Sequence, residues 1–228
     1  MLTFNTFLKE KKIEIPKSNK PITGVFNNPN MEVLGTGIQS TVYSMKSQPS
    51  SVLKVVNVVG DNDPSIQFLR LCSNHQDNPY FPIVRGFKLY DRAELSAEDV
   101  IFLQQNLEYK QYKGKQILLI SMEKLNSIKD FEPERVLKML QVLGLVPTDI
   151  EFEDYYDPIK TMWNRFKDSN YRQLMMTNTP DPKLKNALRL LEPLFKKFKP
   201  DVHGNNIMMR YNGSKIHLVF TDPIWTMK

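Results

Sequence analysis

Apolar and polar residues alternate over two parts of the first half of the chain. Between residues 31 and 56, the stretches MEVLG, TVYSMK and SVLKVV alternate, carry β-branched residues, and are separated by glycines or by the turn SQPS. This pattern predicts an antiparallel meander of three strands. Two later stretches, GFKLYD and KQILLISME, predict further strands of the same sheet.

Helical spacing of apolar residues replaces alternation elsewhere. Pro64 opens PSIQFLRLC, and the apolar residues of this stretch predict one buried helix face. Longer stretches with the same spacing begin at Pro133, Asp157 and Asp181, each with a proline at a first helical position. Pro193 lies inside the last of them and should bend it. The order of strands and helices predicts an α+β chain.

The last part of the chain combines strands with polar residues. Residues 199–222 read KPDVHGNNIMMRYNGSKIHLVFTD, in which IMMRY and IHLVFT are strand-like. Asn212-Gly213 predicts a two-residue turn between them. Such a hairpin would hold the two ends of the stretch close together.

Two regions lack these patterns. Residues 1–30 contain several prolines and paired asparagines, and they predict an extended arm. Residues 93–113 stand between two predicted strands, and Ser96 and Asp99 occupy capping-box positions at the start of a helical stretch. We expect this second region to be an insertion.

The composition is typical of a folded protein in a reducing compartment. Of 228 residues, 41% are hydrophobic, which suffices for a core. A single cysteine, Cys72, excludes a disulfide framework and a cysteine-built zinc site. The first residues lack the apolar core of a signal peptide, and no apolar run approaches the roughly 18 residues of a membrane span. We therefore expect a cytoplasmic protein that has no membrane partner.

The net charge of +6 is spread along the chain. Lysines gather in the N-terminal arm and again at Lys196, Lys197 and Lys199. Runs of this size are usually solvated faces, so we do not expect nucleic-acid binding. An acidic protein partner and a polyphosphate ligand both agree with the charge.

Three polar residues near the predicted hairpin suit phosphoryl transfer. Asp201 stands five residues before Asn206, and Asp222 follows the second strand. The carboxylate of Asp201 could accept or orient the proton of an attacking hydroxyl. Asn206 and Asp222 offer the hard oxygen ligands that Mg²⁺ prefers on nucleotide phosphates. A surface loop that happens to carry two acids is the alternative, because D-x-x-x-x-N is a common spacing.

A glycine-bearing turn and a strand lysine lie upstream. Gly35 and Gly37 precede Ser40 and Val42 in the first turn of the meander, and Lys54 follows in VLKVV. Glycines let backbone amides approach phosphate oxygens, and a lysine within an apolar run needs an anionic partner. An ordinary hairpin with a lysine facing solvent is the alternative.

The order of these motifs resembles a protein-kinase-like fold. G-x-G-x-x-S-x-V is followed by V-L-K-V, D-x-H-x-x-N and T-D-P. More narrowly, LGTGIQSTVYS with VLKVV, and DVHGNNIMMRYNG with FTDP, resemble the early serine/threonine protein kinases of short-tailed bacteriophages. The resemblance implies two lobes, a small antiparallel-sheet lobe at 31–124 and a reduced helical lobe at 125–228.

The resemblance also implies roles for single residues. ATP and Mg²⁺ would be the cofactors, with Asp201 in the catalytic position and Asn206 and Asp222 as metal ligands. His203 could touch the transferred phosphate or the acceptor, and a turn histidine bonded to the backbone is its alternative. ATP would contact the residues of the glycine turn, the strand lysine and two hinge residues whose backbone could bind adenine: Gly35, Gly37, Ser40, Val42, Lys54, Glu123 and Leu125.

The sequence departs from the kinase pattern in two places. Kinases place a glutamate on the helix after the strand lysine, whereas this helix has none, and Gln67, Asp63 or Asp61 would have to substitute. Only PIWTMK follows Asp222, so we expect no activation segment. Regulation would then come from the N-terminal arm, the insertion or a partner.

The leading hypothesis is ATP- and Mg²⁺-dependent phosphorylation of Ser or Thr in a host protein, in the host cytoplasm if the chain is phage-encoded. One alternative is a kinase-like phosphotransferase for a small molecule or lipid, favoured by D-x-H-x-x-N and the missing peptide platform. The other is a pseudokinase that acts by binding a host protein, favoured by the missing helix glutamate. The sequence predicts neither the acceptor protein nor an oligomeric state.

Overall fold

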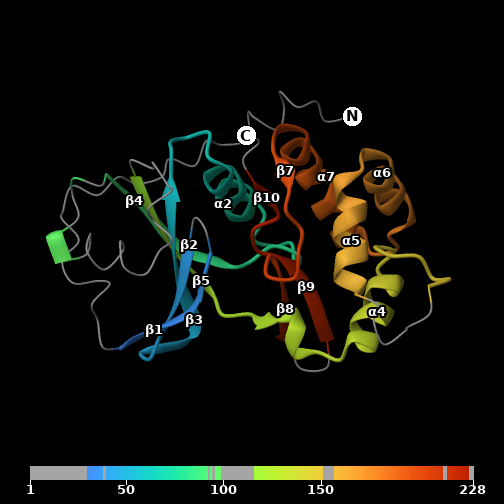
Figure 1. Cartoon of the computed structure of the whole chain (residues 1–228), viewed down its shortest axis with the longest axis horizontal. Coiled ribbons are helices and arrows are strands. Elements are labelled where there is room, and N and C mark those ends of the chain that lie inside the picture. The colour runs from blue at the N-terminus through green and yellow to red at the C-terminus, as the bar shows by residue number, and fades with distance from the viewer. Residues whose placement is uncertain are drawn as a thin grey trace. The chain divides into compact units, whose positions relative to one another are not determined.

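A computed structural model describes residues 30–37, 40–91, 93, 96–98, 116–150, 157–212 and 215–225 (Figure 1). The chain forms two compact units. The first takes its described residues from Met1–Ser73 and Ile83–Lys124, and the second from Asn74–Pro82 and Leu125–Lys228. The predicted arm at 1–30, apart from residue 30, and most of the predicted insertion at 93–113 lie outside the described residues.

The first unit is built on one antiparallel sheet. Its strands follow the order β1-β2-β3-β5-β4, so the first three form the predicted meander and the last two complete the sheet. Their bounds are β1 Met31–Thr36, β2 Ser40–Met45, β3 Gln48–Val58, β4 Val84–Asp91 and β5 Gln116–Glu123. The alternating pattern therefore predicted this sheet correctly.

The core of the first unit lies between the central strands and one helix. Val56 and Val58 on β3 and Leu118 on β5 are almost fully buried. They join Ile66 and Leu69 from α2, Pro64–Asn74, in one apolar cluster. Because the helix buries the face that its spacing indicated, this prediction is confirmed.

Four α-helices and a short 3₁₀ helix belong to the second unit. Asp157 and Asp181 cap two of them, each accepting two backbone N–H groups through Oδ1 at 2.7 to 3.1 Å. The helices α4, α5, α6 and α7 pack in succession along the chain (Figure 1). Their bounds are η3 Ile128–Asp130, α4 Pro133–Val142, α5 Pro158–Lys167, α6 Ser169–Asn178 and α7 Pro182–Lys197.

Helix α6 was not predicted from the sequence. Asp168 ends α5 and also caps α6, with its Oδ1 accepting the Asn170 N–H at 2.7 Å. The helix buries only Arg172 and Met175. Arg172 pairs with Glu192 of α7, Nε to Oε2 at 2.8 Å, with side chains 8% and 10% exposed. Because Arg172 is a charged residue at a buried position, the helical spacing of apolar residues is incomplete in this stretch.

Three short pairings complete the second unit. The hairpin strands β8, Ile207–Asn212, and β9, Lys215–Phe220, are antiparallel, and β6, Asn126–Ser127, pairs with β8. The register pairs Asn212 with Lys215, so Asn212 belongs to β8 and not to the predicted two-residue turn Asn212-Gly213. A separate two-strand ladder joins β7, Lys199–Pro200, to β10, Ile224–Trp225.

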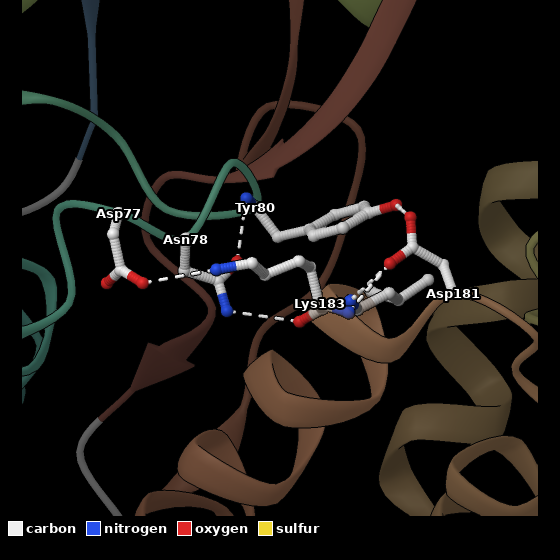
Figure 2. A network of polar contacts seen from close by, with 6 residues as sticks. Asp77, Asn78, Tyr80, Asp181 and Lys183 are labelled. Carbon is white, nitrogen blue, oxygen red and sulfur yellow. Dashed lines mark hydrogen bonds and ion pairs between the residues drawn. The ribbon is translucent and has the colours of Figure 1, made fainter.

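The segment after α2 belongs to the second unit, although the sequence pattern assigned it to the sheet lobe (Figure 2). Tyr80 donates its hydroxyl to Asp181 Oδ2 at 2.6 Å, and Asn78 donates its amide to the carbonyl of Lys183 at 3.0 Å. Arg210 on β8 donates to the carbonyls of residues 79 and 81. Burial, together with the hydrogen bond and charge of Asp181, raises the pKa of Tyr80, which keeps this hydroxyl a donor.

The described residues thus form a mixed α+β protein with an antiparallel five-stranded sheet and five α-helices. None of these helices is long and apolar enough to cross a membrane.

Candidate functional site

Two backbone pairings in the second unit bring Asp201, Asn206 and Asp222 together. Strand β7 ends directly before Asp201, and its partner β10 begins two residues after Asp222. The Asp201 N–H donates to the carbonyl of Pro223 at 2.8 Å, and the Thr221 N–H donates to the carbonyl of Asn206 at 3.0 Å. Each side of Asp222 is therefore bonded to the segment that carries the other two residues.

The amide of Asn206 is fixed on Asp201. Its Nδ2 donates to the Asp201 backbone carbonyl at 2.8 Å and to Asp201 Oδ2 at 3.0 Å. The same nitrogen is also 3.1 Å from His203 Nε2, so three neighbours lie around an NH₂ group that has two hydrogens. The Asn206 N–H also donates to the carbonyl of His203 at 2.8 Å, which closes the loop between the two.

Two oxygen atoms of the pair are left without such contacts. Among the described residues, neither Oδ1 of Asn206 nor Oδ1 of Asp201 takes part in a hydrogen bond. Because the amide nitrogen is held on Asp201, the amide oxygen is turned away from it. One carboxylate oxygen and one amide oxygen of the pair are thus not used by the hydrogen bonds between the two residues.

The charge of Asp201 is disfavoured by its surroundings. Burial raises the pKa of its carboxyl above the ordinary value, and the negative charge of Asp222 raises it further. His203, the hydrogen bond from Asn206 and the charge of Lys199 act in the opposite direction. The side chain is 24% exposed, so it remains accessible to a reactant.

His203 lies beside this carboxylate. Its Nε2 is 3.6 Å from Asp201 Oδ2, and its Nδ1 accepts the Asn205 N–H at 3.2 Å. The indole of Trp163 on α5 meets the imidazole edge-on, with ring centroids 6.0 Å apart. The ring thus bonds the backbone, as its alternative role expects, and contact with a phosphate or an acceptor stays a prediction.

The site suits a cation held jointly by protein and phosphates. No group of three or more His, Cys, Asp or Glu side chains among the described residues could hold a metal by itself. Asn206 Oδ1 and the carboxylate of Asp222 are hard oxygen donors on one site, and Mg²⁺ is commonly bound by one or two such side chains plus substrate phosphates. The donor chemistry of these two residues is therefore compatible with Mg²⁺.

The predicted phosphate turn lies between β1 and β2 of the first unit, and residues 38 and 39 of it are outside the described residues. The Gly37 N–H donates to the Ser40 carbonyl at 2.7 Å, and Val42 packs on the sheet core. A Cβ added at Gly35 would meet nothing within 4 Å, and one at Gly37 only Ser40, at 3.7 Å. The described neighbours therefore leave room for a Cβ at both positions.

Lys54 lies on β3, opposite Val42 on β2 and Ile120 on β5. It is only 9% exposed. The alternative of a lysine facing solvent is therefore wrong.

The three proposed substitutes for a helix glutamate have local partners. Asp63 caps α2, accepting the Ser65 N–H at 3.0 Å and the Val59 N–H at 3.2 Å. Gln67 donates to the carbonyl of Asp61 at 2.6 Å, and the Asp61 carboxylate pairs with Arg70 at 3.3 Å. These contacts give all three residues a role in starting the helix.

Glu123 and Leu125 stand where the chain passes from the first unit to the second. The Glu123 N–H donates to the Ile83 carbonyl at 3.0 Å, and its carboxylate accepts the Ile83 N–H at 2.8 Å. The backbone N–H of Glu123 is thus engaged within the first unit. Lys54 belongs to one unit and Asp201 with Asp222 to the other, so their common cleft stays a prediction.

In comparisons with known proteins, the chain matches no protein-family model and no curated protein.

Sequence reasoning missed two contributors to the site. The ladder of β7 and β10 has two residues in each strand, too few for any periodicity. Lys129 donates to Asn205 Oδ1 at 2.9 Å across 76 positions of sequence, and no local pattern marks such a contact.

Proposed function

We propose that this chain transfers the terminal phosphoryl group of ATP, with Mg²⁺, to a hydroxyl group. The observation that carries the proposal is the amide of Asn206, whose Nδ2 donates to the backbone carbonyl and to Oδ2 of Asp201. In the proposed reaction one residue thereby orients a base and offers its amide oxygen as a metal ligand.

Asp201, Asn206 and Asp222 of the second unit have different roles in the proposed reaction. Oδ1 of Asp201 faces the acceptor hydroxyl and takes its proton as the hydroxyl oxygen bonds to phosphorus and the bond to ADP breaks. Asn206 Oδ1 and Asp222 would hold Mg²⁺, which would neutralise charge on the phosphates. The raised pKa of Asp201 makes it a stronger base than an exposed aspartate.

The first unit would bind the nucleotide. The turn with Gly35 and Gly37 covers the phosphates, and Lys54 reaches them from β3. The carbonyl of Glu123 and the backbone of Leu125 bind adenine. An antiparallel sheet with one helix and a helical second unit are compatible with a two-lobed protein-kinase-like fold, and the motif order supports it.

We propose Ser or Thr of a host protein as the acceptor. The support is the resemblance of the two motif blocks to the early kinases of short-tailed bacteriophages. The host cytoplasm is then the place of action, and ATP and Mg²⁺ are abundant there.

Radiolabel transfer from ATP into host lysate tests the proposal. Wild-type protein should label one or more proteins in a Mg²⁺-dependent manner, and phosphoamino-acid analysis should yield phosphoserine or phosphothreonine. Asp201→Asn should still bind ATP–Mg²⁺ yet transfer about 10²- to 10⁴-fold more slowly. Asp222→Asn should instead weaken the Mg²⁺-dependent part of ATP binding, because a full charge facing the metal is lost. No transfer by the wild type, or a wild-type rate for Asp201→Asn, would refute the proposal.

A pseudokinase is the second candidate. The observation that favours it is on α2, where Asp63, Gln67 and Asp61 are all engaged in local contacts at the start of the helix. A lysine without a helix carboxylate would hold the phosphates less firmly. This candidate predicts a host phenotype that Asp201→Asn leaves unchanged, which the kinase proposal does not.

A further inference from the structure

A lysine far away in sequence reaches the loop that carries Asp201 and Asn206. Lys129 lies in η3, at the start of the second unit, and its Nζ donates to Asn205 Oδ1 at 2.9 Å. Its Cε is 3.4 Å from the place of a Cβ on Gly204, and Ile159 Cγ2 is 3.7 Å from the same place. The lysine stem therefore lies along Gly204, opposite a residue of α5.

The backbone beneath Lys129 is firmly held. The Lys129 N–H donates to Ser127 Oγ at 3.2 Å, and Asp130 Oδ2 accepts the Ser127 N–H at 3.1 Å, which completes a capping box. Ile128 is 2% exposed. The ammonium group thus extends from a fixed base.

The contact continues from Asn205 to the imidazole of His203. The side chain of Asn205 is bonded to Lys129, and its backbone N–H donates to His203 Nδ1 at 3.2 Å. A ring nitrogen that accepts a hydrogen bond carries no proton. In the neutral ring the proton therefore sits on Nε2, the atom 3.6 Å from Asp201 Oδ2.

The amide of Asn206 lies close to the same ring nitrogen. Asn206 Nδ2 is 3.1 Å from His203 Nε2, and 2.8 and 3.0 Å from the backbone carbonyl and Oδ2 of Asp201. With the proton of the neutral ring on Nε2, the two amide hydrogens point to Asp201 rather than to His203. Both nitrogens then lie beside Oδ2 of Asp201, with His203 Nε2 at 3.6 Å.

We propose that Lys129 is a positioning residue that acts through Asn205 to hold His203 with its Nε2–H directed at Asp201. The predicted effect on kcat rests on the proposed phosphoryl transfer. The predicted orientation of the His203 ring does not depend on it. Lys129 itself touches neither reactant nor metal in this scheme. Its effect belongs to the turnover step, because ATP is bound by other residues.

The test compares three variants of the full chain. Lys129→Met keeps the stem and removes the donor, Lys129→Arg restores a cationic donor, and Lys138→Met removes an exposed lysine that pairs with Glu134 on α4. Nitrogen NMR of the imidazoles reports which ring nitrogen carries the proton, with His75 and His217 as internal references. Since the Lys129 contact is exposed, the melting temperature of each variant should stay within about 2 °C of wild type.

We expect the wild-type spectrum to show the Nε2–H form of His203 and Lys129→Met to show a mixture of both forms, with Lys129→Arg close to wild type. In transfer assays Lys129→Met should lower kcat by about 10- to 100-fold with KM for ATP unchanged. Asn205→Ala should cause a similar loss, and the double variant no further loss, because the lysine acts through the asparagine.

A wild-type ring in the Nδ1–H form, or a Lys129→Met spectrum identical to wild type, would overturn the inference. So would additive losses in the double variant, or a kcat that Lys138→Met lowers equally. If the wild type transfers no phosphate, the proposed function fails, and the NMR comparison still decides the role of Lys129.

Discussion

Replacing Asn206 by aspartate separates its two roles. As a metal ligand, a carboxylate at this position would be as good as an amide or better. As a donor to Asp201 it fails, because oxygen atoms would replace the NH₂ group 2.8 Å from the Asp201 carbonyl and 3.0 Å from Oδ2. The geometry therefore predicts loss of activity from a change that a simple metal site would tolerate.

The size of the effect follows from these distances. Two carboxylates about 3 Å apart repel by about 5 kcal/mol at the effective dielectric constant of partly exposed sites. Such a pair relieves the repulsion by sharing a proton, as paired carboxylates do. A proton held between residues 201 and 206 occupies the base, so transfer at neutral pH should fall by about 10²- to 10⁴-fold.

Two measurements check Asn206→Asp. Calorimetry should show ATP–Mg²⁺ binding close to wild type, whereas initial rates of phosphate transfer should show the loss. Asn164→Asp makes the same chemical change on α5, where Asn164 Oδ1 only accepts from Lys167 at 3.3 Å, and it should leave both quantities unchanged. A wild-type rate for Asn206→Asp would mean that the bonds to Asp201 are not needed for transfer.

Further predictions concern pH, nucleotide binding and stability. The proposed base Asp201 must be ionised to act, and its pKa is raised above the ordinary value. Activity should therefore be full at high pH and should fall, as the pH is lowered, around a pKa above the ordinary aspartate value of about 3.9. A fall in activity at or below that value would contradict the assignment of Asp201. Lys54→Ala should weaken ATP–Mg²⁺ binding more than it lowers the melting temperature, and unchanged affinity in calorimetry would return Lys54 to a purely structural role. Arg172→Met should leave Glu192 buried without its partner and destabilise the fold by about 3 to 5 kcal/mol, or about 6 to 20 °C in melting temperature. A shift as small as that of Lys138→Met would show that the buried pair contributes little.

The parts of the fold that local patterns determine could be predicted from sequence. Alternation indicated the five strands, and Asp157 and Asp181 marked helix starts because an aspartate followed by a proline is favourable at the start of a helix. What could not be predicted depends on partners distant in sequence. Arg172 lies in a helix whose burial needs Glu192, and the segment around Tyr80 joins the second unit through Asp181.

The candidate site, too, could be predicted only in part from the sequence. The spacing of Asp201, Asn206 and Asp222 in sequence indicated the residues, because their chemical types and order are enough to suggest phosphoryl transfer. It contained no information on how the amide of Asn206 is turned or which nitrogen of His203 faces the carboxylate. Those follow from hydrogen bonds that the folded loop makes.

Folding alone gives no reason for a carboxylate at position 201. An asparagine there could accept the same hydrogen bond from Asn206 through its amide oxygen, and its backbone N–H and carbonyl would keep their partners. It would also avoid the cost of holding a charge that burial and Asp222 both disfavour. A carboxyl whose pKa is higher in the folded than in the unfolded protein is harder to ionise in the folded state. It therefore lowers the free energy of unfolding at every pH above its ordinary pKa. Asp201→Asn should therefore be at least as stable as wild type at neutral pH, and a lower melting temperature of the variant would contradict this account of the site. The proposed role of Asp201 as a base would give a reason for a carboxylate that folding does not require.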